Sequence, residues 1–567
     1  MTLGRAPTQT NLLSSSSEYC RELLHENSLY SLLERESHRI FPDESFADLF
    51  QNVGRRSIPP RIVAVVMVLQ RAEGLSDREA VDRFSFDLRW KFAAGGLDYD
   101  YPSFAHTVLV NMRERLRRSE RPDRIFEVVL EICRQAGMVG QRRAFDSTAL
   151  YDAVATQDTV TLIRSAIRGL LQAADSELGV HLRAALKRDD DYQQAGKPVC
   201  AWDDREARQE LVDELAKDGY AVLGCLDGME LATPVSEAGR LLATVLGQDL
   251  EQTADGTFRI ARGVAADRVI STVDPESRHG HKTAARGFDG YKGHISEDPD
   301  SEIIVVCDVT AGNVGDGQAA TPLVDEVIEQ ARSQQEQQPA VEAFGDASYG
   351  TAEIVERLEE ANVEVFVKVQ QPAPPKKGLF SKSEFDIDLK AQTVSCPAGK
   401  LVAIRTVNSR DVVGRASFGK HCADCPLRDK CTTSKEGRVV RIHPSEDTLQ
   451  RNRKRQKSPE WKQHYRSIRP KVERKFGHLM RRHHGGRRAR VRGTERVRAD
   501  FSLLCAVANL QRLAVMGVTL GDEHRSPSAA LFDLLGRLWE LLGASNAPSC
   551  RLQADRPSDR HAHLALA

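Results

Sequence analysis

The stretch GYKGHISEDPDSEIIVVCDVTAG, residues 290–312, contains two strand-like segments on either side of the turn-forming residues Asp298, Pro299 and Asp300. Pro and Asp in the middle of such a stretch predict a tight turn, and the β-branched residues around them predict strands. We therefore expect an antiparallel pair of strands here. The other strands of the chain are expected to assemble around this pair.

Further strands are predicted upstream and downstream of the pair. Upstream, RRAFDS at 142–147 places two apolar residues directly before Asp146 and is strand-like. Three strands that meet first, followed by alternating helices and strands, give the order of a ribonuclease H-like mixed sheet. The pattern predicts a mixed α/β fold of this kind. The downstream helices are predicted at 316–332 and 353–361, and the strands at 340–348 and 363–370.

The remaining segments predict additional domains. Helical patterns over 18–121 predict an all-α N-terminal domain, and helical periodicity over about 157–268 predicts a large helical insertion into the sheet domain. A segment with Pro, Cys and short strands at 371–442 predicts a small zinc-ribbon-like insertion. We expect the sheet domain to comprise 138–370 and 443–515, and the chain to finish with a C-terminal tail at 521–567.

The N-terminal helices include a pair that resembles a helix-turn-helix. Gly74 is favourably placed just past the end of one helix, and SDRE, from Ser76 to Glu79, is a capping box that opens the next. Two helices joined by so short a turn occur in modules that read DNA and also in units that only pack or dimerise. The sequence leaves both interpretations open.

The overall composition excludes several classes of protein. Of 567 residues, 41% are hydrophobic and 28% are charged, which is ordinary for a soluble globular protein. The longest apolar run, IVAVVMVL at 62–69, is too short to span a bilayer, and the N-terminal stretch lacks the features of a secretion signal. We expect a cytoplasmic protein with no membrane contact.

Positive charge is concentrated in one region, although the chain as a whole is nearly neutral. Lys and Arg number 80, and Asp and Glu number 81, for a formal net charge of −1. Basic residues dominate 451–498, and the densest part is RRHHGGRRARVRG at 481–493, here called the arginine run. We expect the arginine run to contact DNA phosphates; the alternative is a solvated, disordered segment.

Three acidic residues, Asp146, Asp346 and Glu473, are the candidate catalytic groups. The aspartates sit at or near the ends of strand-like runs, and Glu473 lies on a very basic, helix-like stretch. Two divalent cations can activate a nucleophile and neutralise a leaving oxyanion, and Mg²⁺ prefers carboxylate oxygens. Gly345 and Gly350 flank Asp346, where the backbone is expected to turn sharply. Together the three acids predict a two-metal phosphoryl-transfer site that acts on DNA.

Arg469 lies four residues before Glu473 and so shares its helix face. It is expected to hold the Glu473 carboxylate or a DNA phosphate, and an ordinary ion pair along the helix is the alternative. Pro470 is expected to kink this helix or to start a new one.

The order of these motifs resembles the DDE transposases of bacterial insertion sequences. The motifs are FDST at 145–148, GDASYG at 345–350 and RxxxE at 469–473, followed by Phe-Gly and a basic run. The third motif is similar to the group signature Y-x-x-R-x-x-x-E-x-x-x-x-x-x-K. Two positions depart from it: Tyr465 is one place earlier than the signature tyrosine, and Met480, next to Arg481, occupies the lysine position.

The resemblance implies a ribonuclease H-like catalytic core in which Asp146, Asp346 and Glu473 bind two Mg²⁺ or Mn²⁺ ions. It also implies nicking of double-stranded DNA at terminal inverted repeats and transfer of a 3′ hydroxyl to target DNA, by a nucleoid-associated homodimer that brings two ends together. Tyr291, Lys292 and His294 in GYKGHIS resemble the second-strand motif of these enzymes, although alternating strand exposure explains them nearly as well. The candidate DNA-contacting residues are Arg469, Tyr465, Lys475, Arg481, Arg487, Arg488, Lys292 and His294.

Four of the 11 cysteines predict a metal site. Cys396, Cys422, Cys425 and Cys431 include a C-x-x-C knuckle and match a closed tetrahedral zinc site, with His421 as a possible substitute ligand. Free or redox-sensing cysteines are the alternative. The cluster resembles the Cys-rich insertion of the eleven-eighty-two kind within the same family, which implies a structural or DNA-contacting role.

The sequence therefore predicts an insertion-sequence transposase that cuts and joins DNA. Two other functions are possible for the same motifs. One is a catalytically silent, transposase-derived DNA-binding protein, against which the presence of all three acids argues. The other is a ribonuclease H-like nuclease that cuts DNA without joining it.

Overall fold

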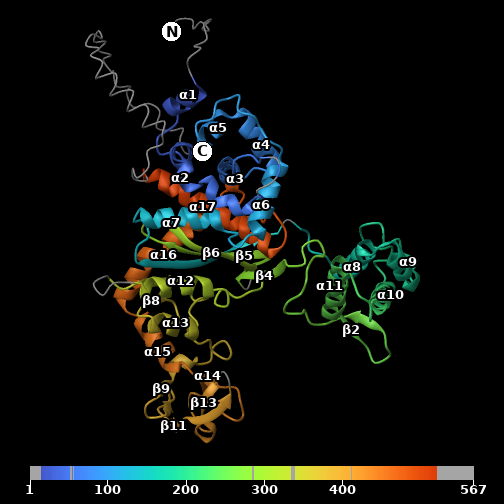
Figure 1. Ribbon diagram of the computed structural model, residues 1–567. Helices are drawn as coiled ribbons and strands as arrows, with labels where there is room; N and C mark the ends of the chain where they lie inside the picture. The colour runs from blue at the N-terminus through green and yellow to red at the C-terminus, as the bar shows by residue number, and fades with distance from the viewer. Residues whose placement is uncertain are drawn as a thin grey trace, which may run out of the picture. The chain divides into compact units, whose positions relative to one another are not determined.

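A six-stranded mixed sheet organises the computed structural model (Figure 1). The strand order is β4-β5-β1-β7-β8, and β6 also pairs with β5. β1 is antiparallel to β5 and parallel to β7, which is parallel to β8. The mixed α/β class is confirmed. The strands are β1 (Arg142–Tyr151), β4 (Arg278–Thr283), β5 (Arg286–Asp298), β6 (Ile303–Ala311), β7 (Glu342–Gly345) and β8 (Glu364–Val367).

The structure describes residues 15–519, apart from 52–53, 55, 153, 284–285, 334–338 and 410–411. The predicted C-terminal tail at 521–567 lies outside the described residues. None of the helices within the described ranges is long and apolar enough to cross a membrane.

The predicted antiparallel pair is β5 and β6, with Ile295 opposite Cys307. Asp298 forms the turn because its Oδ1 accepts hydrogen bonds from the backbone N–H groups of Asp300 at 2.8 Å and Ser301 at 3.0 Å. Glu302 completes the turn in the left-handed region, with φ of 63°. The Asp298 side chain thus stabilises the turn by hydrogen bonds to its backbone, as predicted from the position of this Asp.

Helices cover both faces of the sheet (Figure 1). On one face, α12 (Thr321–Arg332) and α13 (Ala352–Glu360) contribute to a hydrophobic cluster that includes Phe145 of β1. On the other, α17 (Thr494–Val515) packs along β6, where the Asn509 side chain exchanges two hydrogen bonds of 2.8 Å with the backbone of Ile304. Because neighbouring residues of a strand face opposite sides, Asp146 points away from the face that Phe145 occupies.

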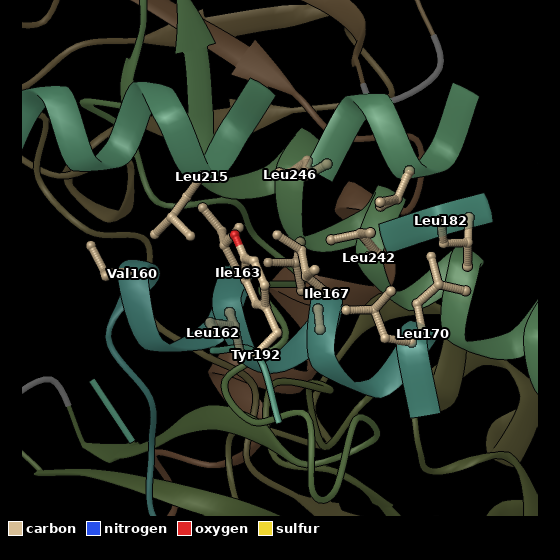
Figure 2. Close-up of a cluster of buried hydrophobic side chains, with 14 of the residues drawn as sticks. Val160, Leu162, Ile163, Ile167, Leu170, Leu182, Tyr192, Leu215, Leu242 and Leu246 are labelled. Carbon is tan, nitrogen blue, oxygen red and sulfur yellow. The ribbon is translucent and has the colours of Figure 1, made fainter. Parts of the chain in front are cut away.

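The insertion between β1 and β4 has a core of its own (Figure 2). Ile163 and Ile167 of α8 meet Leu242 and Leu246 of α11 in this cluster, and Tyr192 donates a hydrogen bond of 2.8 Å to the buried Asp218. The predicted helical character of this segment is confirmed. Its elements are α8 (Thr159–Ala173), α9 (Ser176–Ala185), α10 (Arg205–Gly224), α11 (Thr233–Asp249), β2 (Leu250–Gln252) and β3 (Phe258–Ile260).

The N-terminal segment is helical, as predicted. α3 (Pro60–Glu73) ends at Gly74, which has φ of 67°, and α4 (Asp77–Phe86) begins at the predicted capping box of Ser76 and Glu79. Every side chain of α3 from Ile62 to Ala72 is buried, so this helix is part of the core. The remaining elements are α1 (Ser16–Leu23), α2 (Leu29–Ile40), η1 (Asp43–Leu49), α5 (Leu88–Ala93), α6 (Thr107–Arg118) and α7 (Arg124–Gln135).

The Cys-containing segment forms two small three-stranded sheets around a separate cluster that includes Phe385, Phe418 and Ile442. The strands are β9 (Asp386–Asp388), β10 (Thr393–Ser395), β11 (Leu401–Ala403), β12 (Arg405–Ser409), β13 (Val412–Ser417) and β14 (Val439–Ile442). The short helices are η2 (Lys382–Glu384), η3 (Gly419–Cys422) and α14 (Arg428–Cys431). The chain then returns to the large sheet through α15 (Glu446–Arg455), α16 (Pro459–Leu479) and η4 (Arg482–His484).

Candidate functional site

Asp146 lies in the middle of β1, because the strand continues to Tyr151 instead of ending near Asp146 as the sequence predicted. The backbone N–H of Ser147 donates to Asp146 Oδ1 at 2.8 Å. Burial raises the pKa of the Asp146 carboxyl above its ordinary value, and the Arg469 guanidinium opposes this shift. The carboxylate is therefore positioned by the strand and depends on nearby positive charge to stay ionised.

Asp346 follows the last residue of β7 directly, as predicted. The backbone N–H of Ser348 donates to its Oδ1 at 2.8 Å. A Cβ atom added to Gly350 would collide with the backbone of Lys368 and lie 3.0 Å from Val369 Cα, so this position has room only for glycine. Since β1 and β7 are adjacent, the turn brings Asp346 close to Asp146.

The guanidinium of Arg469 joins the two aspartates. Its Nη2 atom lies 3.0 Å from Asp146 Oδ1 and 4.0 Å from Asp346 Oδ2, and its Nη1 atom donates to the Phe145 carbonyl at 3.2 Å. The Arg469 side chain is only 9% exposed. Arg469 thus contacts these two acids and not Glu473, whereas its expected contact with a DNA phosphate stays a prediction.

Glu473 lies on α16, four residues beyond Arg469, and is exposed. Within the described ranges its carboxylate forms no hydrogen bond or ion pair. α16 runs without interruption through Pro470, so the expected break or restart does not occur. The structure brings Asp146, Asp346 and Arg469 together and leaves Glu473 free at the solvent-exposed surface of the same helix.

Two residues of α16 that we predicted to contact DNA are buried instead. Tyr465 is 6% exposed and donates its hydroxyl hydrogen to the Gly345 carbonyl at 3.3 Å, so it supports the loop that carries Asp346. Lys475 is 5% exposed, and its Nζ lies 4.0 Å from Glu302. Burial lowers the pKa of Lys475, and the negative charges of Glu297 and Glu302 oppose this shift. The helix turns both side chains toward the sheet.

The predicted DNA-contacting residues of β5, His294 and Lys292, bond to neighbouring residues of the protein, and His294 is buried. His294 is fully buried, and its Nε2 lies 2.9 Å from Thr310 Oγ1. Lys292 forms an ion pair of 3.0 Å with Asp316 and donates to the Val314 carbonyl at 2.8 Å. Both side chains lie on a face of the sheet that helices cover. The polar pattern of the strand suggested a surface open to DNA, but these polar side chains bond to other residues of the protein.

Asp316 and Tyr349 were missed in the sequence. Gly317 approaches the Ser348 carbonyl so closely that an added Cβ would lie 2.9 Å from that oxygen, which places Asp316 beside the Asp346 loop. Tyr349 is fully buried; burial raises the pKa of its phenol, and Asp316, Asp146 and Asp346 raise it further. The sequence signal that could have identified Asp316 is its position among the glycines of 312–317, shortly after β6. Asp346 has a similar position, because it follows β7 and has glycines close to it.

The arginine run lies beside the end of β1. Tyr151 N–H donates to the Arg487 carbonyl at 2.9 Å, and Ala489 N–H donates to the Tyr151 carbonyl at 2.8 Å. The side chains of Arg481, Arg487 and Arg488 are exposed, and their contact with DNA phosphates stays a prediction. Since β1 carries Asp146, the backbone pairing links this positive segment to the acidic site.

The four cysteines line one small cavity together with His421 and Phe418. The Arg438 backbone N–H donates to Cys422 Sγ at 3.5 Å. Burial raises the pKa of the Cys431 thiol, and the neighbouring cysteines raise it further, whereas Arg438 lowers it. Across the ranges that the structure describes, no three His, Cys, Asp or Glu side chains are gathered in the arrangement of a metal-binding group, either here or at the aspartates.

Two family models match this chain. One, described as a transposase DDE domain, matches residues 395–514, and the other, described as a transposase domain (DUF772), matches residues 19–115. The two matches support a DDE transposase of insertion-sequence type. The first match contains Glu473 and the four cysteines of the transposase, and the second contains α3 and α4. No curated protein and no solved structure matches the transposase.

Proposed function

We propose that this transposase cleaves DNA at terminal inverted repeats and joins the cut ends to target DNA. The observation that carries the proposal is the meeting of Asp146 and Asp346, from adjacent parallel strands, at a single guanidinium nitrogen. The strand order β6-β5-β1-β7-β8, antiparallel in its first half and parallel in its second, supports a ribonuclease H-like core. The family implies a DNA substrate, and the substrate proposed here is double-stranded DNA.

The residues of the site fit a divalent cation. Asp146 and Asp346 offer carboxylate oxygens, the donors that Mg²⁺ and Mn²⁺ prefer, and both already face the positive charge of Arg469. Asp146, Asp346 and Glu473 would hold two such ions. The bound ions would supply activation of the attacking oxygen and neutralisation of the leaving oxygen.

The other residues position these acids and the DNA. The N–H groups of Ser147 and Ser348 fix one oxygen of each aspartate, and Arg469 favours the ionised form of Asp146. The exposed arginines of the arginine run are suited to hold the phosphate backbone next to β1. We further propose that a homodimer holds two transposon ends in a synaptic complex.

A structural zinc ion is proposed for the Cys-rich segment. Cys396, Cys422, Cys425 and Cys431 share one cavity, and a backbone N–H already donates to Cys422 Sγ, as suits a thiolate ligand. Four cysteine ligands leave no open position, so the role proposed for zinc is to stabilise the fold of this segment.

The test is end cleavage in the presence of Mg²⁺ by the wild type, by Asp346→Ala and by Asp300→Ala. Asp300 is a matched control because it is an exposed Asp of the same sheet domain, in the β5–β6 turn. We expect Asp346→Ala to abolish cleavage and to leave binding of the transposon end largely intact, while Asp300→Ala cleaves normally. Unaffected cleavage by Asp346→Ala would remove Asp346 from the site.

A second assay separates the alternatives. A marked donor and a target plasmid report joining as well as cutting. Cutting without joining would favour a nuclease, and DNA binding with neither reaction would favour a silent relative. Joined products that disappear in Asp346→Ala are the result expected of a transposase.

A further inference from the structure

The arginine run is attached to the C-terminal end of α3, far away in the sequence. His484 donates from Nδ1 to the Ala72 carbonyl at 2.7 Å, and Arg490 donates to the Leu75 carbonyl. The last carbonyl groups of a helix have no partner within the helix and carry partial negative charge. Side chains of the run therefore bond to the last turn of α3 and to the turn that follows it.

Arg71 links α3 to the run and to α17. Its side chain is 3% exposed, its Nη1 donates to the His484 carbonyl, and its Nη2 lies 3.2 Å from Asp500 Oδ2. Leaving a buried guanidinium without partners costs free energy, so Arg71 keeps the His484 carbonyl and the Asp500 carboxylate close to each other. Arg71 thus fixes the backbone of the run against the core of the protein.

Gly74 allows the close contact between α3 and the run. Its φ of +67° and the nearby His483 carbonyl oxygen, with which an added Cβ would collide, both require glycine. The turn between α3 and α4 is therefore shaped to receive the backbone of the run. DNA-reading helix pairs insert a helix into a groove, whereas the turn between these two helices is occupied by protein.

One side of the arginine run contacts the rest of the protein, and the other side is exposed. One side is bonded to the end of α3, and the backbone at Arg487 and Ala489 is bonded to Tyr151 of β1. The other side presents arginines that are exposed and that, within the described part of the chain, form no hydrogen bond or ion pair through their side chains. These residues are Arg481, Arg482, Arg487, Arg488 and Arg492.

We propose that the N-terminal helical segment supports the arginine run from behind and holds it in the conformation that binds DNA, with Arg71 as the positioning residue. This inference rests on the proposed contact between the run and DNA phosphates. Holding a segment in its bound conformation removes the entropy cost of ordering it on binding. The number of phosphate contacts stays the same, so the support changes affinity and leaves its salt dependence unchanged.

The experiment compares wild type, Arg71→Met and Arg124→Met in full-length protein. Arg124 is a matched control because it is similarly buried and pairs with Asp48 at 2.6 Å, and none of its bonds within the described residues reaches the run. Two quantities are measured: affinity for a fluorescein-labelled DNA duplex of arbitrary sequence over a range of salt concentrations, and amide hydrogen exchange across 481–493. For Arg71→Met we expect affinity to fall about tenfold through lost preorganisation, with an unchanged salt slope. We also expect faster exchange in the run, and neither effect in Arg124→Met.

Each other outcome overturns the proposal. Unchanged exchange and affinity in Arg71→Met would mean that the run needs no support, and a smaller salt slope would mean that Arg71 itself contacts DNA. Arg490→Ala, at a less buried position, repeats the test if Arg71→Met does not fold, with the same expected pattern. A double substitution, Arg487→Ala with Arg488→Ala, tests the proposed function separately: if it leaves DNA affinity unchanged, the run does not bind DNA, and hydrogen exchange alone then decides whether α3 supports it.

Discussion

At the scale of single residues, Arg469 explains how two carboxylates, that of Asp146 largely buried and that of Asp346 partly exposed, can lie close together. Asp146 and Asp346 repel each other when both are charged, and burial adds to the cost of charging Asp146. A guanidinium is always charged and offers several donors, so one Arg469 can face both acids and a backbone carbonyl at once. Arg469 thereby favours the ionised form of Asp146, which is the form that binds cations.

Arg469→Gln tests this role through pH dependence. Arg469 lowers the pKa of Asp146, so its removal leaves only the Ser147 N–H to oppose the effect of burial, and the pKa rises further. Because only the ionised carboxylate binds a cation, we expect end cleavage to weaken and its acidic limb to move to higher pH. The measurement is the cleavage rate against pH, with Arg466→Gln, an exposed arginine of the same helix, as control. An acidic limb at the wild-type position would contradict this role.

Glu297 predicts a pH dependence of stability. It is fully buried, neither carboxylate oxygen has a hydrogen-bond partner among the described residues, and burial raises its pKa from 4.5 to about 8. Above about pH 4.5 the unfolded state releases the Glu297 proton, whereas the folded state keeps it until the pH approaches 8. The contribution of Glu297 to the free energy of unfolding is therefore most favourable at low pH and is lost as the pH rises toward 8. Glu297→Gln should remove the decline.

The measurement is the free energy of unfolding in urea between pH 5 and pH 9, values chosen to bracket the raised pKa of Glu297. We expect Glu297→Gln to be more stable than wild type at the alkaline end and closer to it at the acidic end. The exposed Glu329→Gln serves as control and should follow the wild type throughout. Parallel curves for Glu297→Gln and wild type would show that Glu297 is ionised in the folded protein.

At the scale of elements, α16 continues through Pro470, although the proline predicted a kink or a new start, because the packing of the helix on the sheet outweighs this local preference. Ser458 caps its start by accepting a hydrogen bond from Trp461 N–H at 3.2 Å, and Pro459 fits its first turn. Pro470 is exposed, so the carbonyl that it leaves without a helical partner can be solvated. Buried residues recur every three or four positions and hold the helix on the sheet. They include Trp461, Tyr465, Ile468, Val472, Phe476 and Leu479.

Gly350→Ala tests the loop that carries Asp346. The added methyl group would meet the backbone of Lys368 and Val369, which cannot move away as a flexible side chain can. We expect a loss of stability of about 2 kcal/mol, as for other overpacked sites, and a large loss of cleavage because Asp346 is displaced. The measurements are urea unfolding and end cleavage.

Gly477→Ala is the control for this substitution. Gly477 lies in α16, and among the described residues an added Cβ would meet no atom within 4 Å apart from the neighbouring backbone of its own helix, so alanine should be neutral or slightly stabilising there. Wild-type cleavage and stability in Gly350→Ala would show that the close approach of the two backbones is not needed.

At the scale of the whole molecule, the chain has several hydrophobic cores, not one. The cluster of the helical insertion is formed by buried residues between Val160 and Leu246. The sheet and the Cys-rich segment have separate clusters of their own. A segment that buries its apolar side chains against itself does not need the rest of the protein to fold.

We therefore expect residues 157–268, expressed alone, to fold. Its helices should give a cooperative thermal transition in circular dichroism, because its core is complete within the fragment. A matched fragment without α11 should not fold, since Leu242, Val245 and Leu246 would be missing from that core. A non-cooperative melt of the complete fragment would show that the insertion depends on the sheet domain.

The sequence by itself determined the local features. The β5–β6 pair, the capping box before α4, the strand that precedes Asp346 and the helical insertion were all predicted, since each depends on residues near one another in the chain. Residue types at fixed spacing likewise identified the acids and cysteines as candidates. These inferences use turn chemistry, periodicity and capping, which act over a few residues.

Only the tertiary structure decided which side chains meet. It placed Arg469 against Asp146 and Asp346, buried Lys475 and His294 inside the protein, and attached the arginine run to α3. Arg469 and Asp146 are separated by more than three hundred positions, as α3 and the run are by more than four hundred. No local rule relates residues so far apart, because their distance is set by how helices and strands pack, and packing depends on the whole chain at once.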